Sequence, residues 1–401
     1  MKSRHVVVFS SLGHLYVHLC TAFYFVIVLA LEVDWQLPYH RLIELWTLGS
    51  LLVGAAALPA GLLGDRIGAA RMMAVYFIGL GLSSIAAGLS TSPLILMLAL
   101  TGIGGFAAIY HPVGIPWLVR NGGAERGKVL GFNGIFGSLG AAGAGLTAGF
   151  LIDAFSWRAA FIAPGLLCCA TGVVFLGAMA RGRIPDAEPP LDSGSAPSRQ
   201  DMARAFTILL LTMFLGGMVY HTTQTGLPKV FAERHGGLVG DGTLGVGLLV
   251  AGVYTIAGLM QIIGGHLADR FSLKSVYLGA LFLQIPMLWM AASLGGAPLM
   301  FVVTVMVMGN VGMLPAENML LAKYTPGHRH GVAFGLKFAL GFGAAPLSVL
   351  FVSRVSERTG SFYWVFVGLA FCAALAFAVA ILLPPARRES VVPNIVPDRV
   401  Y

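Results

Sequence analysis

The chain is short of charge and of cysteine. Only 10% of its 401 residues are charged, against about 25% in an average globular domain. A soluble fold could not cover the 57% of residues that are hydrophobic, so much of the apolar surface must face lipid. Four cysteines support no disulfide framework, and all lie in apolar runs, where cysteine serves as a packing residue. They are Cys20, Cys168, Cys169 and Cys372.

Motifs of soluble catalytic sites are also missing. The sequence has no Gly-x-Ser-x-Gly elbow, no phosphate-binding Gly-rich loop, no His-Glu-x-x-His helix and no Cys-x-x-Cys pair. No loop is long enough to hold a soluble catalytic domain. We therefore expect neither enzyme activity nor a cofactor.

Long apolar runs dominate what is present. A helix that crosses a bilayer needs about 20 mostly apolar residues, and runs of that size predict twelve spans in an all-helical membrane protein. The expected spans are 8–31, 43–63, 72–90, 93–119, 129–152, 158–180, 205–231, 243–265, 275–293, 298–322, 331–353 and 361–384. The first run follows Lys2 and Arg4 as a signal peptide would, but no small-residue cleavage site precedes its spanning length, so we expect a retained helix.

The positive charge follows the expected topology. With the N-terminus in the cytoplasm, 18 of the 25 Lys and Arg residues lie on that side, six lie outside and Lys337 falls within a span. This asymmetry is typical of a bacterial inner-membrane protein with both termini cytoplasmic. The net charge of +8 therefore reflects topology and predicts no nucleic-acid partner.

The chain reads as two similar halves. Residues 181–204, rich in Pro and Ser, predict a cytoplasmic linker between six-helix bundles at 1–180 and 205–384, with a cytoplasmic tail at 385–401. Residue pairs at an offset of 203 or 204 support a duplication, which is common in transporters. They are Asp65 and Asp269, Gly127 and Gly331, Gly131 and Gly335, Gly137 and Gly341, and Pro112 and Pro315.

A loop after the second span carries a family resemblance. Gly61–Arg71 reads GLLGDRIGAAR, and a weaker copy, GHLADRFSLK, begins at Gly265 after the eighth span. With the twelve spans, the first segment resembles the Gly-x-Leu-x-Asp-Arg-x-Gly loop of the major facilitator superfamily, and the resemblance covers nearly the whole chain. It implies a gating motif formed by Gly61, Gly64, Asp65, Arg66, Gly68, Arg71, Asp269 and Arg270.

In that family the loop aspartate contacts the start of helix 11 and helps to close the cytoplasmic side. The resemblance therefore implies that Asp65 lies near His330 and Gly331. The alternative is that Asp65, Arg66 and Arg71 only anchor the loop among the lipid headgroups.

Ionisable residues inside the membrane are costly, about 2.5–3.5 kcal/mol each on insertion scales, and are functional candidates. Glu317 and Lys337 each lie six residues from the expected cytoplasmic end of consecutive spans, roughly 9 Å deep, so they can form a pair. Asn133 occupies the position of Lys337 in the first half. The pair predicts either a proton- or substrate-sensitive switch or a structural staple between helices 10 and 11.

Other polar residues gather on helices 1, 4, 7 and 10, which line the cavity in this superfamily. His14 and His18 share one helix face, and histidine titrates near physiological pH, which suits a proton relay. A transition-metal site is the alternative, but no carboxylate or thiol completes a ligand set beside these two, so we expect no metal. The expected substrate and proton pathway comprises His14, His18, His111, Asn133, His221, Gln224, Asn310, Glu317, Asn318 and Lys337.

Direction depends on finer features. Ile109–Gly114 resembles fosmidomycin-resistance-type exporters, and the glycine-rich fifth span partly resembles that of antiporters, without its proline. The fourth span lacks the arginine usual in proton-coupled drug exporters, which leaves His111 as its titratable residue. We expect a monomeric, proton-driven exporter of a small organic molecule. An importer of a small nutrient and a non-transporting membrane assembly factor remain as alternatives.

Overall fold

The computed structural model describes residues 2–121, 126–185, 199–240, 242–325 and 330–384. Within these ranges the chain forms helices, turns and short connections, and no strand. The middle of the predicted linker and the predicted tail lie outside the described residues, so their boundaries stay predictions.

The first half begins with a long helix that breaks at Phe23, and its fourth span contains a π-helical turn, η1. Its elements are α1 (Lys2–Ala22), α2 (Tyr24–Trp35), α3 (Tyr39–Glu44), α4 (Thr47–Ala55), α5 (Ala57–Ile67), α6 (Ala69–Gly88), α7 (Pro93–Ala107), η1 (Tyr110–Gly114), α8 (Ile115–Asn121), α9 (Arg126–Ala154) and α10 (Trp157–Ala180).

The second half has longer, less interrupted helices. Its elements are α11 (Arg199–Arg234), α12 (Thr243–Arg270), α13 (Leu273–Ala291), α14 (Gly296–Gly312), α15 (Leu314–Lys323), α16 (His330–Thr359) and α17 (Tyr363–Ile381). Helix α11 begins at Arg199, so residues 199–204, expected in the linker, are helical and continuous with the seventh span.

The predicted number of spans agrees with the helices. Among the described residues, eleven helical stretches are long and apolar enough to cross a membrane. The pair Tyr39–Ala55 and Ala57–Ile67, bent by 47°, makes a twelfth if it counts as one span. The fold is therefore that of an all-helical polytopic membrane protein.

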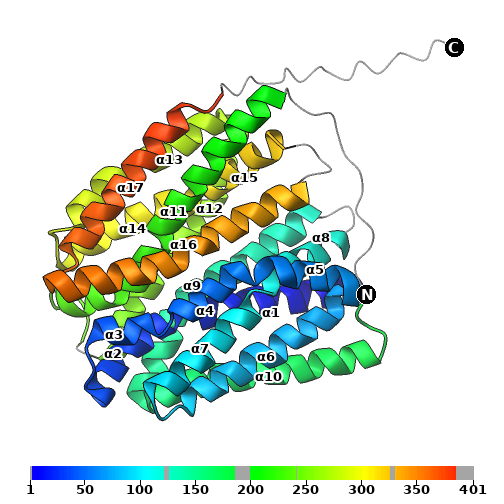
Figure 1. Cartoon of the computed structure of the whole chain (residues 1–401), viewed down its shortest axis with the longest axis horizontal. Helices are drawn as coiled ribbons and strands as arrows, with labels where there is room; N and C mark the ends of the chain where they lie inside the picture. The colour runs from blue at the N-terminus through cyan, green and yellow to red at the C-terminus, as the bar shows by residue number, and fades with distance from the viewer. Residues whose placement is uncertain (1, 122–125, 186–198, 241, 326–329, 385–401) are drawn as a thin grey trace.

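The two halves form two groups of helices, seen in the lower and upper parts of Figure 1. Helix α9 packs on α12, and α4 with α3 packs on α16, which joins the groups along two seams. Glycines allow the first seam: a Cβ on Gly247 would lie 2.2 Å from the carbonyl oxygen of Gly145, and a Cβ on Gly149 would lie 2.6 Å from that of Thr243. Backbones can approach this closely only where side chains are absent.

Polar contacts between the halves concentrate at the end of the molecule that holds α2 and α3, opposite the start of α1 (Figure 1). They are Lys229 Nζ to Glu32 Oε2 at 2.7 Å, Ser353 Oγ to Glu44 Oε1 at 2.7 Å, Tyr39 OH to Thr225 O at 3.2 Å, and Leu244 N to Asp153 Oδ2 at 2.8 Å. The halves are thus held together by charge and hydrogen bonds at this end.

Candidate functional site

Two glycines of α9 determine how the histidines of α1 sit. A Cβ on Gly137 would lie 2.6 Å from the ring of His14, and one on Gly140 would lie 2.3 Å from the carbonyl oxygen of Leu15 and 3.1 Å from Cβ of His18. Because neither glycine has a side chain, α1 and α9 pack closely and the His14 ring fits between them.

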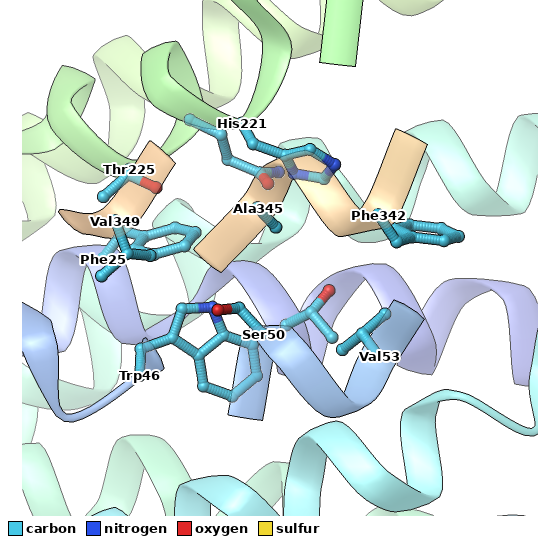
Figure 2. A pocket seen from close by; sticks show the side chains of 11 residues that line it. Phe25, Trp46, Ser50, Val53, His221, Thr225, Phe342, Ala345 and Val349 are labelled. Atoms are coloured by element: carbon cyan, nitrogen blue, oxygen red, sulfur yellow. The ribbon is translucent and has the colours of Figure 1, made fainter. Parts of the chain in front are cut away.

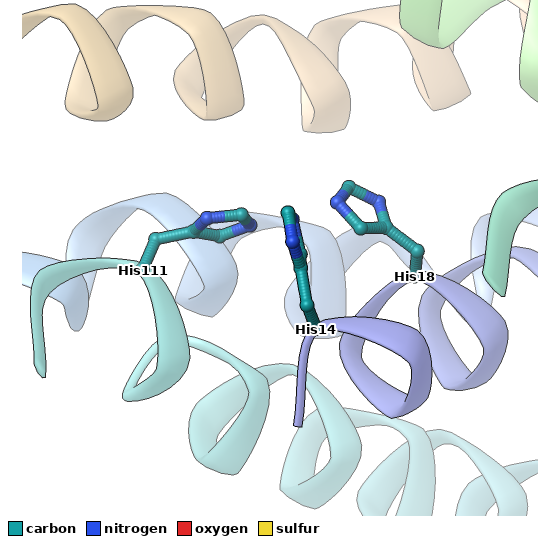
Figure 3. A group of neighbouring side chains, drawn as sticks. All are labelled: His14, His18 and His111. Atoms are coloured by element: carbon teal, nitrogen blue, oxygen red, sulfur yellow. The ribbon is translucent and has the colours of Figure 1, made fainter. Parts of the chain in front are cut away.

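The structure brings a third histidine to this pair. His14 and His18 come from α1 and His111 from η1, and the three rings point toward one another in Figure 3. Their centroids are 5.0 Å apart for His14 and His18 and 5.5 Å apart for each of these with His111. One ring nitrogen from each residue lies within 4.8 Å of the others. We call these three residues the histidine triad.

His111 is the most enclosed member of the triad, with 7% of its surface exposed. Its ring stacks on Phe338 at 5.3 Å and lies 5.1 Å from Phe342, both from α16 of the other half. Within the described part of the chain, neither of its ring nitrogens has a hydrogen-bond partner. A buried polar group without a partner is costly. Binding of a ligand, a water or a proton at this ring would lower that cost.

Asn133 links Ser10, Tyr110 and His14 through hydrogen bonds on the α9 side of the histidine triad. Its side-chain amide donates to the Tyr110 hydroxyl at 2.9 Å and to Ser10 Oγ at 3.3 Å. Its backbone carbonyl oxygen lies 2.9 Å from Nδ1 of His14, and Tyr110 stacks on the His14 ring at 5.1 Å. This network fixes one side of the histidine triad without a charge.

The second half carries a charged centre instead. Lys337 Nζ lies 2.7 Å from Glu317 Oε1, so the pairing expected from their equal depth is present. Lys337 also donates to Asn318 Oδ1 at 2.5 Å. The hydroxyl of Tyr277 donates to Glu317 Oε2 at 3.1 Å and lies 2.9 Å from Thr212 Oγ1. The side chain of Glu317 is only 3% exposed and that of Lys337 12%.

A small cavity lies between the halves on the other side of Phe342, between α11, α16, α4 and the junction of α1 and α2 (Figure 2). His221 and Gln224, both predicted pathway residues, line it with Trp46 and Ser50. Its volume of about 30 Å³ suits one or two waters. An organic molecule would need the halves to move apart here.

Not every predicted pathway residue faces this region. Asn310 is buried and donates from Nδ2 to Gln284 Oε1 at 3.0 Å and to the Gly216 carbonyl oxygen at 3.3 Å. Its amide thus joins α14 to α13 and α11. Its expected role in the pathway stays a prediction, while its observed contacts are those of a helix-bridging residue.

The predicted gating motif is a tight corner between α5 and α6. Gly68, which caps α5, has φ 96°, a conformation that favours glycine. A Cβ on Gly61 would lie 3.3 Å from Pro112, and one on Gly64 would lie 2.9 Å from Val113, so α5 rests directly on η1.

The charged members of this motif lie on the surface. The side chains of Asp65 and Arg66 are exposed, and Arg71 donates to the carbonyl oxygen of Ile67. In the copy at the C-terminal end of α12, Asp269 and Arg270 are also exposed. The resemblance places His330 and Gly331 beside Asp65, but the surroundings of these two residues lie outside what the structure describes, so the gate contact stays a prediction.

Sequence reasoning missed the contacts that hold the halves together. Glu32, Glu44, Asp153 and Ser353 lie at the ends of spans, where charged and polar residues are usual. Nothing in their spacing marks them as inter-half partners. The repeated glycines of the fifth span were a usable signal, because Gly145 and Gly149 form the α9–α12 seam.

Comparison with known proteins now identifies the family. The model of the Major Facilitator Superfamily matches residues 11–244 and 238–398. The chain belongs to the major facilitator superfamily. As a member of this superfamily, it is a membrane transporter and not an enzyme.

Solved structures agree with the fold of this superfamily member. The peptide transporter POT in complex with sulfate has a TM-score of 0.74 at 16% identity and covers 95% of each chain. An inward-facing bacterial homologue of the human lysosomal transporter Spinster has a TM-score of 0.70 at 13% identity, also over 95% of each chain. At such identities the likeness establishes the fold alone.

One curated relative is similar in sequence. The putative niacin/nicotinamide transporter NiaP of Bacillus subtilis (strain 168) is 26% identical over 203 residues, which is 50% of this chain and 48% of that protein. The match spans about half the length of either protein.

Proposed function

We propose that this superfamily member is a proton-coupled secondary transporter of a small organic solute. The observation that carries the proposal is the buried pair of Glu317 on α15 and Lys337 on α16. A charge pair in the membrane interior is costly to maintain. A role for this carboxylate in proton transfer, in which it exchanges its lysine partner for a proton, would explain why the chain contains such a costly pair.

The contacts of Glu317 support its proposed role as the proton-binding group. Glu317 accepts hydrogen bonds from Lys337 and from Tyr277. Protonation of Glu317 would remove its attraction for Lys337, which could then turn toward an anionic group of the cargo. In this scheme a proton on Glu317 promotes binding of the cargo to Lys337, which is the coupling of a symporter. Export would instead require the proton and the cargo to bind this centre alternately.

His111 of the histidine triad contacts Phe338 and Phe342 of α16, the helix that also carries Lys337. Rings of this kind stack on planar organic groups, and Lys337 and Asn318 offer donors to an acceptor on the cargo. A small aromatic or amphipathic molecule with a weakly acidic group fits this set of side chains better than a sugar or a highly charged ion.

We propose export as the direction, on the resemblance of Ile109–Gly114 to fosmidomycin-resistance-type exporters. Uptake of a small nutrient is the second candidate, because the relative NiaP is named a niacin/nicotinamide transporter. We also propose a monomer in the bacterial inner membrane with cytoplasmic termini. In that topology the contacts of Lys229 and Asp153 lie on the outer side.

The test is proton flux in proteoliposomes that hold a pH gradient, with candidate weak acids and amphipathic compounds added in turn. We expect one class of compound to dissipate the gradient with the wild-type protein. Glu317→Gln should abolish this compound-induced proton flux while the compound still binds. Glu357→Gln, which changes an exposed carboxylate on α16, serves as the matched control and should retain it.

The direction follows from the same vesicles loaded with labelled compound. Movement of the labelled compound in the direction opposite to the protons means exchange, and hence export in the cell. Movement in the same direction as the protons means symport, and hence uptake. Compound movement without any proton flux would contradict coupling, and the ion pair would then be a structural staple.

A further inference from the structure

We propose that the histidine triad binds a divalent transition-metal ion of the Zn²⁺ class. The inference concerns His14, His18 and His111 alone and does not rest on proton coupling or on the direction of transport. Three imidazoles with an open fourth position form one of the established zinc ligand sets. The sequence pairs only His14 with His18; the π-helical turn supplies the third ligand.

The distances are close to those that a metal requires. In a tetrahedral site with Zn–N bonds of about 2.0–2.1 Å, ligating nitrogens lie roughly 3.4 Å apart. One ring nitrogen from each member of the triad already lies within 4.8 Å of the others. Small rotations of the side chains of His18 and His111, without movement of α1 or η1, would close the difference.

The second observation is that His14 and His111 each have a ring nitrogen available to bind a cation. The Nδ1 atom of His14 lies 2.9 Å from the carbonyl oxygen of Asn133. A donated N–H at Nδ1 leaves the lone pair on Nε2, the arrangement that orients metal-bound histidines in proteins. His111, 7% exposed, has no hydrogen-bond partner for either nitrogen among the described residues, and a metal bond would satisfy one of them.

The surroundings select the kind of metal. No carboxylate or thiol joins the triad among the described residues, so a hard cation such as Mg²⁺ or Ca²⁺ finds too few oxygen ligands. Neutral imidazoles favour Zn²⁺, Ni²⁺, Cu²⁺ or their analogue Co²⁺. All three ligands belong to the first half, so a bound metal would not tie the two halves together.

The experiment uses the full-length protein in detergent, freed of any affinity tag, titrated with Co²⁺ near neutral pH. Co²⁺ bound by nitrogen in a four-coordinate site shows intense visible d–d bands. We expect one equivalent to bind. His14→Gln and His111→Gln should each weaken binding by at least about 10–100-fold, the range that loss of even an outer-shell partner produces. His221→Gln and His266→Gln, which lie outside the triad, are the matched controls.

X-ray absorption of the wild-type protein loaded with Zn²⁺ tests the site without any variant that could misfold. Three imidazole nitrogens at about 2.0 Å would support the proposal. Absence of Co²⁺ binding at a hundred-micromolar concentration would overturn it. Binding that is unchanged in His14→Gln and His111→Gln, or lost equally in His221→Gln, would overturn it as well.

Discussion

Removing one partner of the buried pair between α15 and α16 should destabilise the protein strongly. In Glu317→Gln the ammonium of Lys337, which is 12% exposed, keeps only Asn318 as a neutral partner. In Lys337→Met the carboxylate of Glu317, which is 3% exposed, keeps only Tyr277. Leaving one buried charge without its counter-ion costs about 3–5 kcal/mol.

The double substitution should behave differently. Because Gln and Met together leave no buried charge, Glu317→Gln with Lys337→Met is expected to recover most of the lost free energy of unfolding. The control is Arg354→Gln on the same helix as Lys337. It breaks a pair with Glu357 whose side chains are 58% and 41% exposed, and exposed pairs contribute about 0–1 kcal/mol.

Reversible unfolding in mixed micelles of a mild detergent and dodecyl sulfate measures these free energies. Single substitutions that cost less than about 0.5 kcal/mol, the usual range for surface changes, would refute the reasoning. The double variant also separates the two roles of the pair. Normal transport with normal pH dependence means a staple, whereas recovered stability with lost proton coupling means a switch.

Two further predictions concern the contacts between the halves. Gly247→Val would place a side chain against the carbonyl oxygen of Gly145, 2.2 Å from the Cβ position. We therefore expect the free energy of unfolding to fall by about 1–3 kcal/mol and transport in liposomes to be lost. The control Gly265→Val, with open space at its Cβ position, should leave stability and transport unchanged within error. Asp153→Ala removes the acceptor for the backbone and side chain of Thr243, so spin labels on α9 and α12 should report a larger separation at this end by pulsed electron resonance; an unchanged distance distribution would argue against a closing role.

Much of the fold could be predicted from the sequence because a bilayer makes length and hydropathy decisive. Twelve apolar runs predicted twelve spans, and the helical rise gave Glu317 and Lys337 the same depth. The breaks inside spans could not be predicted in this way. Pro112 marks an irregularity at Tyr110–Gly114 because it lacks a backbone N–H, but hydropathy does not reveal that this irregularity is a π-helical turn.

The candidate site was predictable only in its parts. Helical spacing placed His14 and His18 on one face, but the rotation of η1 about its axis decides that His111 joins them, and hydropathy says nothing of rotation. The same reason explains Asn310, whose position on an expected cavity-lining helix suggested the pathway but whose amide donates to Gln284. Depth follows from sequence, whereas orientation follows from the neighbouring helices.

The pair of Glu317 and Lys337 has an electrical consequence. The two charges cancel, so the membrane voltage exerts no net force on this part of α15 and α16 while the pair is intact. A proton on Glu317 would leave the positive charge of Lys337 uncompensated, and displacement of one charge through the full field is worth about 2.3 kcal/mol per 100 mV. Asn133, at the matching position of the first half, is neutral in either state, so voltage would act unequally on these two matched positions of the duplicated chain.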